Sequence, residues 1–103
     1  MIQKLRKRKH DFIVVPVATF APEPYELLQR LEVVVEPSGD EYVATFFDAN
    51  VNAGGCTETE AVDNLKDTML SLFEYLASRP AKRLGPGPTK QLAVLRDFIR
   101  KRE

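Results

Sequence analysis

The side chains that could carry out chemistry are few, and they do not form a catalytic pattern. His10 is the only histidine and Cys56 the only cysteine of the 103 residues, so neither has a second ligand at the spacing of a zinc site. Cys56 directly precedes a predicted helix, where amide dipoles could lower the pKa of its thiol and make it reactive. Because no base partner accompanies it, we expect instead a small residue tolerated in a turn.

Four carboxylates are the only group that could hold a magnesium ion: Asp48, Glu58, Glu60 and Asp63. Two-metal catalysis needs inward-facing carboxylates that hold two ions about 3.5–4 Å apart. Helix capping explains Glu60, and the helix dipole and solvent explain Glu58 and Asp63. We therefore predict that the protein is not an enzyme and uses no metal or cofactor.

Runs of β-branched residues between turn residues predict a small sheet that would position these groups. Runs with the alternation of half-buried strands occupy residues 12–17, 31–36, 42–47 and 51–53. Pro16 cannot donate to a ladder, which favours an edge position for the first run. The turn at residues 37–40 predicts an antiparallel hairpin. The proline-containing segment 19–29 is predicted to be a loop.

Two amphipathic helices are expected beside that sheet. Thr57 is a typical N-cap, because its hydroxyl can accept from the Glu60 amide while the Glu60 carboxylate reaches back to the Thr57 amide. The apolar stripe of this helix continues to about Ser78. A second helix over residues 88–101 follows a Gly- and Pro-rich connector. Its apolar face either folds back on the long helix or docks on another chain, and we predict self-association through Leu92, Leu95, Phe98 and Ile99.

The sequence therefore predicts an α+β fold, with a three- to four-stranded, mostly antiparallel sheet covered by one long helix, plus a C-terminal helix. We divide the chain into a basic tail (1–11), a sheet-and-helix domain (12–79) and a connector with its helix (80–103). A length of 103 residues, with 44% hydrophobic residues, suits one core. No apolar run approaches the ~20 residues that span a bilayer, and one cysteine suits a reducing compartment. We expect a cytoplasmic protein without a membrane partner.

The charges balance overall but are unevenly distributed. The chain has 15 basic and 15 acidic residues. Residues 1–10 contain five basic and no acidic groups, and residues 80–103 contain seven basic and two acidic groups, so the excess of acid lies between them. Such an acidic body repels phosphate and favours a basic protein partner. The basic ends could attract nucleic acid instead.

Residues 32–76 resemble the HicB-like antitoxin family. The family pattern has a hairpin of the type Asp-Gly-Tyr-x-Ala-x-Phe, an Asp-centred turn and a helix start of the type Gly-Asp-Thr-x-x-Glu-Ala. The matching residues here are Asp40, Tyr42, Ala44, Phe46, Asp48, Gly55, Thr57, Glu60, Ala61, Asn64 and Leu65. Glu41 stands where the family has its hairpin glycine.

The resemblance implies a degenerate ribonuclease-H-like domain without catalytic acids, which neutralises a small basic ribonuclease of the HicA type by covering its active face. We accordingly predict a non-enzymatic antitoxin or antitoxin-derived regulator. Its predicted partner contacts are Asp40, Tyr42, Asp48, Glu58 and Asp63. The alternative is a nucleic-acid-binding accessory protein, whose contacts would be Lys4, Arg6, Lys7, Arg8, Lys9, Arg96 and Arg100. About fifteen residues follow the connector, too few for the helix-turn-helix that many family members carry.

Overall fold

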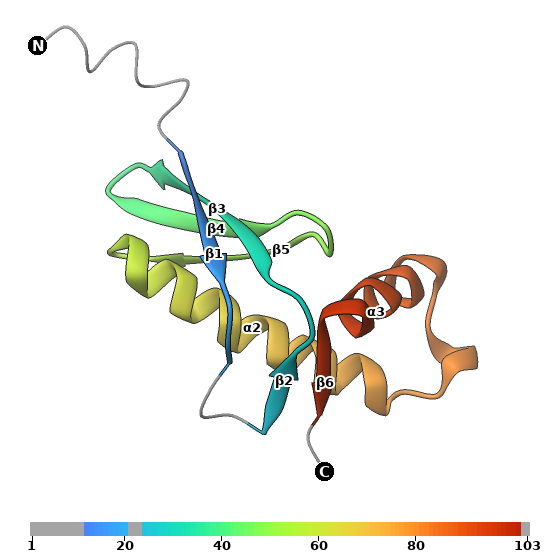
Figure 1. Ribbon diagram of the computed structural model, residues 1–103. Helices are drawn as coiled ribbons and strands as arrows, with labels where there is room; N and C mark the ends of the chain where they lie inside the picture. The colour runs from blue at the N-terminus through green and yellow to red at the C-terminus, as the bar shows by residue number, and fades with distance from the viewer. Residues whose placement is uncertain (1–11, 21–23, 102–103) are drawn as a thin grey trace, which may run out of the picture.

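Two small sheets and two helices make up the part of the chain that the computed structural model describes, residues 12–20 and 24–101 (Figure 1). In chain order the elements are β1 (Ile13–Val17), β2 (Tyr25–Leu27), β3 (Leu31–Ser38), β4 (Glu41–Phe46), β5 (Val51–Gly55), α2 (Glu58–Ser78), a 3-10 turn (Ala81–Arg83), α3 (Pro86–Phe98) and β6 (Ile99–Lys101). The predicted basic tail, residues 1–11, lies outside these described ranges. Within them, no helix combines the length and hydropathy that crossing a bilayer requires.

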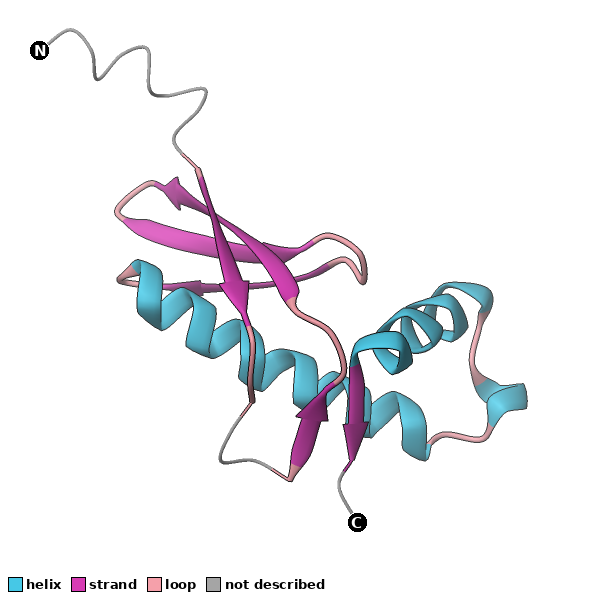
Figure 2. Ribbon diagram, in the orientation of Figure 1, coloured by secondary structure: helices cyan, strands magenta, loops and turns pink. Residues whose placement is uncertain are grey.

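The main sheet is antiparallel throughout, with the strand order β1-β3-β4-β5, and α2 lies across one of its faces (Figure 2). Because side chains alternate along a strand, every second residue faces α2. These residues form the buried sheet side of the core: Val17, Leu31, Val33, Val35, Ala44, Phe46 and Val51. The buried stripe of α2 contributes Ala61, Leu65, Met69, Leu70, Phe73 and Leu76 to the same core. The predicted α+β fold is confirmed.

The edge position predicted for the first strand is also confirmed. In the main sheet β1 pairs only with β3, and Pro16 lies opposite Glu32 in that ladder. A proline is tolerated there because an edge strand has one row of amides that makes no ladder bonds. The predicted hairpin is β3–β4, and Gly39 in its turn has a φ of 63°, a conformation that glycine adopts without strain.

The loop predicted over residues 19–29 was wrong at residues 25–27, and the helix predicted to reach residue 101 was wrong over its last three residues. Tyr25–Leu27 is strand β2, α3 ends at Phe98, and Ile99–Lys101 is strand β6, which pairs antiparallel with β2. The amide of Leu28 donates to the carbonyl of Phe98 over 2.7 Å. This bond satisfies a carbonyl at the helix end and lets the chain leave the helix as a strand.

The prediction that the apolar face of α3 is free to self-associate is corrected as well. Leu92, Leu95 and Ile99 are 7%, 0% and 2% exposed within the single chain. The half-buried ring of Phe98 meets the ring of Phe46 edge to face, with 5.0 Å between the centroids. The apolar face of α3 packs on the core of its own chain. Of the two alternatives that the sequence left open, folding back and docking on another chain, the structure has the first. These side chains are therefore not available to a second copy.

The small β2–β6 sheet attaches to the C-terminal half of α2. The hydroxyl of Tyr25 donates to the carboxylate of Glu74, and the Tyr25 ring packs edge-on against Phe73 at 6.1 Å between centroids. An ion pair of 2.7 Å joins Arg100 to Glu26 across the same two strands. Together with α3, this sheet supplies the additional apolar surface that the far end of the long helix needs.

Candidate interaction surface

The segment from β3 to the end of α2 concentrates negative charge. Residues 31–78 contain ten carboxylates and one basic residue, Lys66. Residues 79–101 contain seven basic groups and one carboxylate. The start of α2 and the β3–β4 turn lie at one end of the molecule, and α3 and its connector lie at the other (Figure 1). The described part of the molecule therefore has an acidic end and a basic end.

Five carboxylates define the acidic end: Asp40, Glu41, Glu58, Glu60 and Asp63. The register of β4 and β5 places Tyr42 opposite Gly55, so the start of β4 lies beside the last residue before the turn into α2. Gly55 in turn lies directly against the backbone of Ala61. Two strand ends and the first turns of a helix thus bring these acids together.

The N-terminus of α2 is capped largely as predicted. The Thr57 hydroxyl accepts from the Glu60 amide over 3.0 Å. The Glu60 carboxylate accepts from the amide of Cys56, one residue before the predicted Thr57 donor. The first contact satisfies an amide that a helix start leaves without an intrahelical partner, and the second satisfies an amide of the turn before the helix. The cap fixes the position of Glu60 at the acidic end.

The exposed thiol of Cys56 lies within this field of negative charge. The charges of Glu60 and then Glu41 raise its pKa above the ordinary value, because a thiolate beside carboxylates is repelled. A thiolate activated by the helix dipole, which the sequence left open, is therefore not what the surroundings favour. A raised pKa means less thiolate, and hence a slower nucleophile, at any pH below it.

Alkylation kinetics can measure this field. In Glu60→Gln the amide oxygen can still accept from the Cys56 amide, but the charge is gone, so the thiol pKa should fall. At mildly alkaline pH, we expect wild-type Cys56 to react more slowly with iodoacetamide than free N-acetylcysteine does, and Glu60→Gln to react several-fold faster than wild type. Glu58→Gln is the matched control, since Glu58 is not among the causes of the shift. Equal acceleration by both variants would contradict the assignment.

Four of the predicted partner contacts lie at or near the acidic end, and one does not. Asp40 is in the β3–β4 turn, Tyr42 is half-buried at the start of β4, and Glu58 and Asp63 are exposed on the first turns of α2. Asp48 follows the opposite end of β4. Six extended residues separate those ends by roughly 20 Å, so a single contact at the acidic end does not include Asp48.

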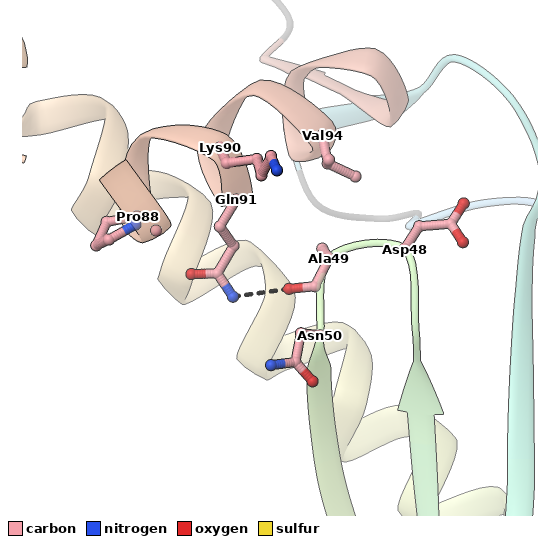
Figure 3. Close-up of a pocket in the computed structure, with 8 residues that line it drawn as sticks. Asp48, Ala49, Asn50, Pro88, Lys90, Gln91 and Val94 are labelled. Carbon is pink, nitrogen blue, oxygen red and sulfur yellow. Dashed lines mark hydrogen bonds between the residues drawn. The ribbon is translucent and has the colours of Figure 1, made fainter. Parts of the chain in front are cut away.

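Asp48 instead lines a hollow of about 330 Å³ between the β4–β5 turn and the start of α3 (Figure 3). The side-chain amide of Gln91 donates to the carbonyl of Ala49 over 2.7 Å and ties the helix to the turn. Asn50 in this turn has a φ of 56°, a conformation that asparagine tolerates better than most residues. Lys90 also lines the hollow. The sequence did not predict this contact, because no residue pattern indicates that α3 lies against the β4–β5 turn.

The described part of the chain contains no group of three or more His, Cys, Asp or Glu residues arranged to hold a metal ion. Asp48 is separated from Glu58 and Asp63 by the length of β4, so the four carboxylates considered as a magnesium site do not converge. The carboxylates of the acidic end form an exposed, charged surface and not an enclosed cluster of metal ligands.

The predicted nucleic-acid contacts are divided between described and undescribed residues. Arg96 is exposed on α3, whereas Arg100 is engaged with Glu26, and that carboxylate raises the pKa of the guanidinium. Lys4, Arg6, Lys7, Arg8 and Lys9 lie outside the described residues. The predicted contacts did not include Lys82 and Arg83 of the connector, which are exposed and belong to the same basic segment as Arg96.

Comparison of the chain with protein-family models, with curated proteins and with solved structures finds no match. The resemblance to HicB-like antitoxins stays a prediction based on the hairpin and helix-start residues quoted above.

Proposed function

We propose that this protein is a non-enzymatic interaction module of the HicB-like antitoxin type, which acts in the cytoplasm and binds a small basic protein through its acidic end. The single observation that carries the proposal is the gathering of Asp40, Glu41, Glu58, Glu60 and Asp63 at one end of the fold. A ribonuclease that grips RNA is basic, and its inhibitor should present the opposite field.

Two carboxylates of the acidic end are exposed on the first turns of α2. Within the described residues, Glu58 and Asp63 form no ion pair, and the one ion pair found there joins Arg100 to Glu26. The helix backbone that carries these carboxylates is already ordered, so the conformational cost of binding is limited to their side chains. The arrangement suits recognition by charge and shape rather than a chemical step.

Neutralising two of these charges tests the proposal. We expect tagged wild-type protein to capture a small basic protein from the native host, identified by mass spectrometry. Glu58→Gln/Asp63→Asn should then bind that purified partner at least tenfold more weakly, about 1.4 kcal/mol, because the partner's cations lose their counter-charges. Isothermal titration would measure the affinities.

The matched control is Glu32→Gln/Asp97→Asn, which removes the same charge from exposed positions at the start of β3 and near the end of α3. Its affinity should stay within about twofold of wild type, since exposed charges beyond a Debye length of ~8 Å are largely screened. Recovery of no basic protein, or equal weakening by the two double variants, would count against binding through the acidic end.

The second candidate function is nucleic-acid binding through the basic end. The observation that favours it is the concentration of Lys82, Arg83, Lys90 and Arg96 on the connector and α3, far from the acidic end. A salt titration with DNA and RNA distinguishes the two functions. A steep fall of log affinity with log salt indicates phosphate contacts, whereas a module that binds only protein should have no measurable affinity for either nucleic acid.

A further inference from the structure

Strand β1 is an exposed, apolar edge. It is the outermost strand of the order β1-β3-β4-β5, and no other strand of the described chain pairs with its outer side. Phe12, which directly precedes the strand, and Ile13 and Val14 at its start are 48%, 45% and 50% exposed. Natural proteins usually protect such an edge with charged residues, prolines or bulges. Here only Pro16, near the far end of the strand, interrupts the row of free amides.

A groove runs between this edge and the first turns of α2. Its volume is about 230 Å³, and its lining residues are Ile13, Val15, Glu58, Thr59, Val62 and Asp63. Ile13 and Val15 pair with the buried Val35 and Val33, so their side chains lie on the helix side of the sheet. The groove thus combines apolar residues of β1 and α2 with two carboxylates of the acidic end.

We propose that the basic partner docks an extended segment beside β1, which adds a further strand to the sheet and sets its alternate side chains into the groove. This inference rests on the proposed function, which supplies a basic partner. In strand addition, main-chain hydrogen bonds give affinity and pockets for every second side chain give specificity. The side chains of the partner segment that face the groove should therefore be apolar next to Ile13, Val15 and Val62. Basic residues on either side of them should reach Glu58 and Asp63.

The charges around the groove favour a basic partner segment beside β1 over a second copy of the chain. Strand β1 contains no basic residue that could meet Glu58 or Asp63. Antiparallel pairing of two β1 strands would also bring the first turns of one α2 toward their counterparts, where residues 58–67 contain four carboxylates and one lysine. Like charges placed together across an interface cost free energy. A segment that carries lysine or arginine removes this penalty.

The test uses the full-length protein and a blocked probe peptide, Lys-Thr-Val-Thr-Val-Thr-Lys, followed by nuclear magnetic resonance. Lysine and valine occupy one face of this peptide as a strand, and threonine the other. We expect shifts and slowed hydrogen exchange at β1 amides, and at least tenfold tighter binding than for the same peptide with glutamate in place of lysine. Glu58→Gln/Asp63→Asn should reduce the preference for lysine at least fivefold.

Two N-methylated forms of the peptide test the strand itself without altering the protein. The amides of the valines and those of the threonines point to opposite edges of the added strand. N-methylation at one set should weaken binding at least tenfold, and methylation at the other should change it less than threefold. If both forms bind alike, the contact is by charge alone, and the added strand is overturned while acidic-end binding stands.

Protein variants complete the design. Ile13→Lys places a cation in the groove and should weaken binding at least tenfold. Phe47→Lys alters another exposed apolar residue, just beyond the far end of β4, and should leave the affinity within twofold of wild type. Equal effects of both variants would overturn the site. Absence of probe binding, in a protein whose captured partner still depends on Glu58 and Asp63, would overturn the inference alone. If the protein has the mass of a dimer and its β1 amides are already protected from exchange before any peptide is added, a second copy covers the edge. That result would also overturn the inference.

Discussion

Replacing Gly55 by alanine is expected to lower the free energy of unfolding by about 3 kcal/mol, a large share of the ~5–15 kcal/mol that holds a domain of this size together. A Cβ at Gly55 would lie 2.5 Å from the nitrogen of Ala61, 2.8 Å from the carbonyl carbon of Glu60 and 2.9 Å from the Cα of Ala61. All three are backbone atoms of α2, so relief requires moving the helix away from the sheet. Urea denaturation followed by circular dichroism measures the loss.

Gly54→Ala is the neighbouring control. Its Cβ would be 3.5 Å from the Tyr42 carbonyl oxygen, which is ordinary contact, so we expect a change within about 0.5 kcal/mol. A Gly55→Ala protein as stable as Gly54→Ala would show that α2 does not approach β5 this closely.

The two glycines illustrate what the sequence could and could not establish. A Gly-Gly pair favours a sharp bend in the chain, but here both glycines belong to strand β5, and the chain turns toward α2 only after them. Neither glycine has a positive φ, however, so neither is required by its backbone conformation. Gly55 is required by the distance between β5 and α2. That distance is a property of tertiary packing, which residue types alone do not reveal.

Regular periodicity made β3, β4 and α2 predictable. Leu31, Val33 and Val35 alternate with exposed or half-buried residues along β3, and the α2 stripe repeats over several turns. Strands β2 and β6 have three residues each, too few for a pattern to be recognised, and their hydrogen bonds join segments more than seventy residues apart. The local sequence at residues 99–101 is compatible with helix, and tertiary pairing decides otherwise.

The acidic end could be assembled from the sequence only in part. An antiparallel hairpin followed by a short strand and a helix brings Asp40 and Glu41 near Glu58 and Glu60, as found. The same hairpin places Asp48 at the other end of β4, and grouping it with the others followed the family motif instead of the topology. The charge pattern was visible in the sequence, but the groove beside β1 was not, because it depends on how far α2 lies from that strand.

The apolar face of α3 shows a limit of prediction from sequence, because an amphipathic stripe predicts that a face is buried but not what covers it. In this structure the chain's own core covers the face, and the second large effect follows from that packing. Leu95→Ala should lower the free energy of unfolding by about 3 kcal/mol, since Leu95 is fully buried against the chain's own core. Lys90→Ala, an exposed change on the same helix, should alter it by less than about 0.5 kcal/mol.

Protein concentration separates internal packing from association. If α3 packs on its own chain, the denaturation midpoints of wild type and Leu95→Ala should not change over a hundredfold range of protein concentration, because unfolding is then unimolecular. A midpoint that rises with concentration would instead indicate that a second copy covers this face. A Leu95→Ala protein in which only α3 is lost, while the sheet and α2 unfold as in wild type, would show that α3 is a separate unit. The edge-on contact of Phe98 with Phe46 and the β2–β6 pairing argue for one cooperative transition, because losing α3 would also expose the end of the main core.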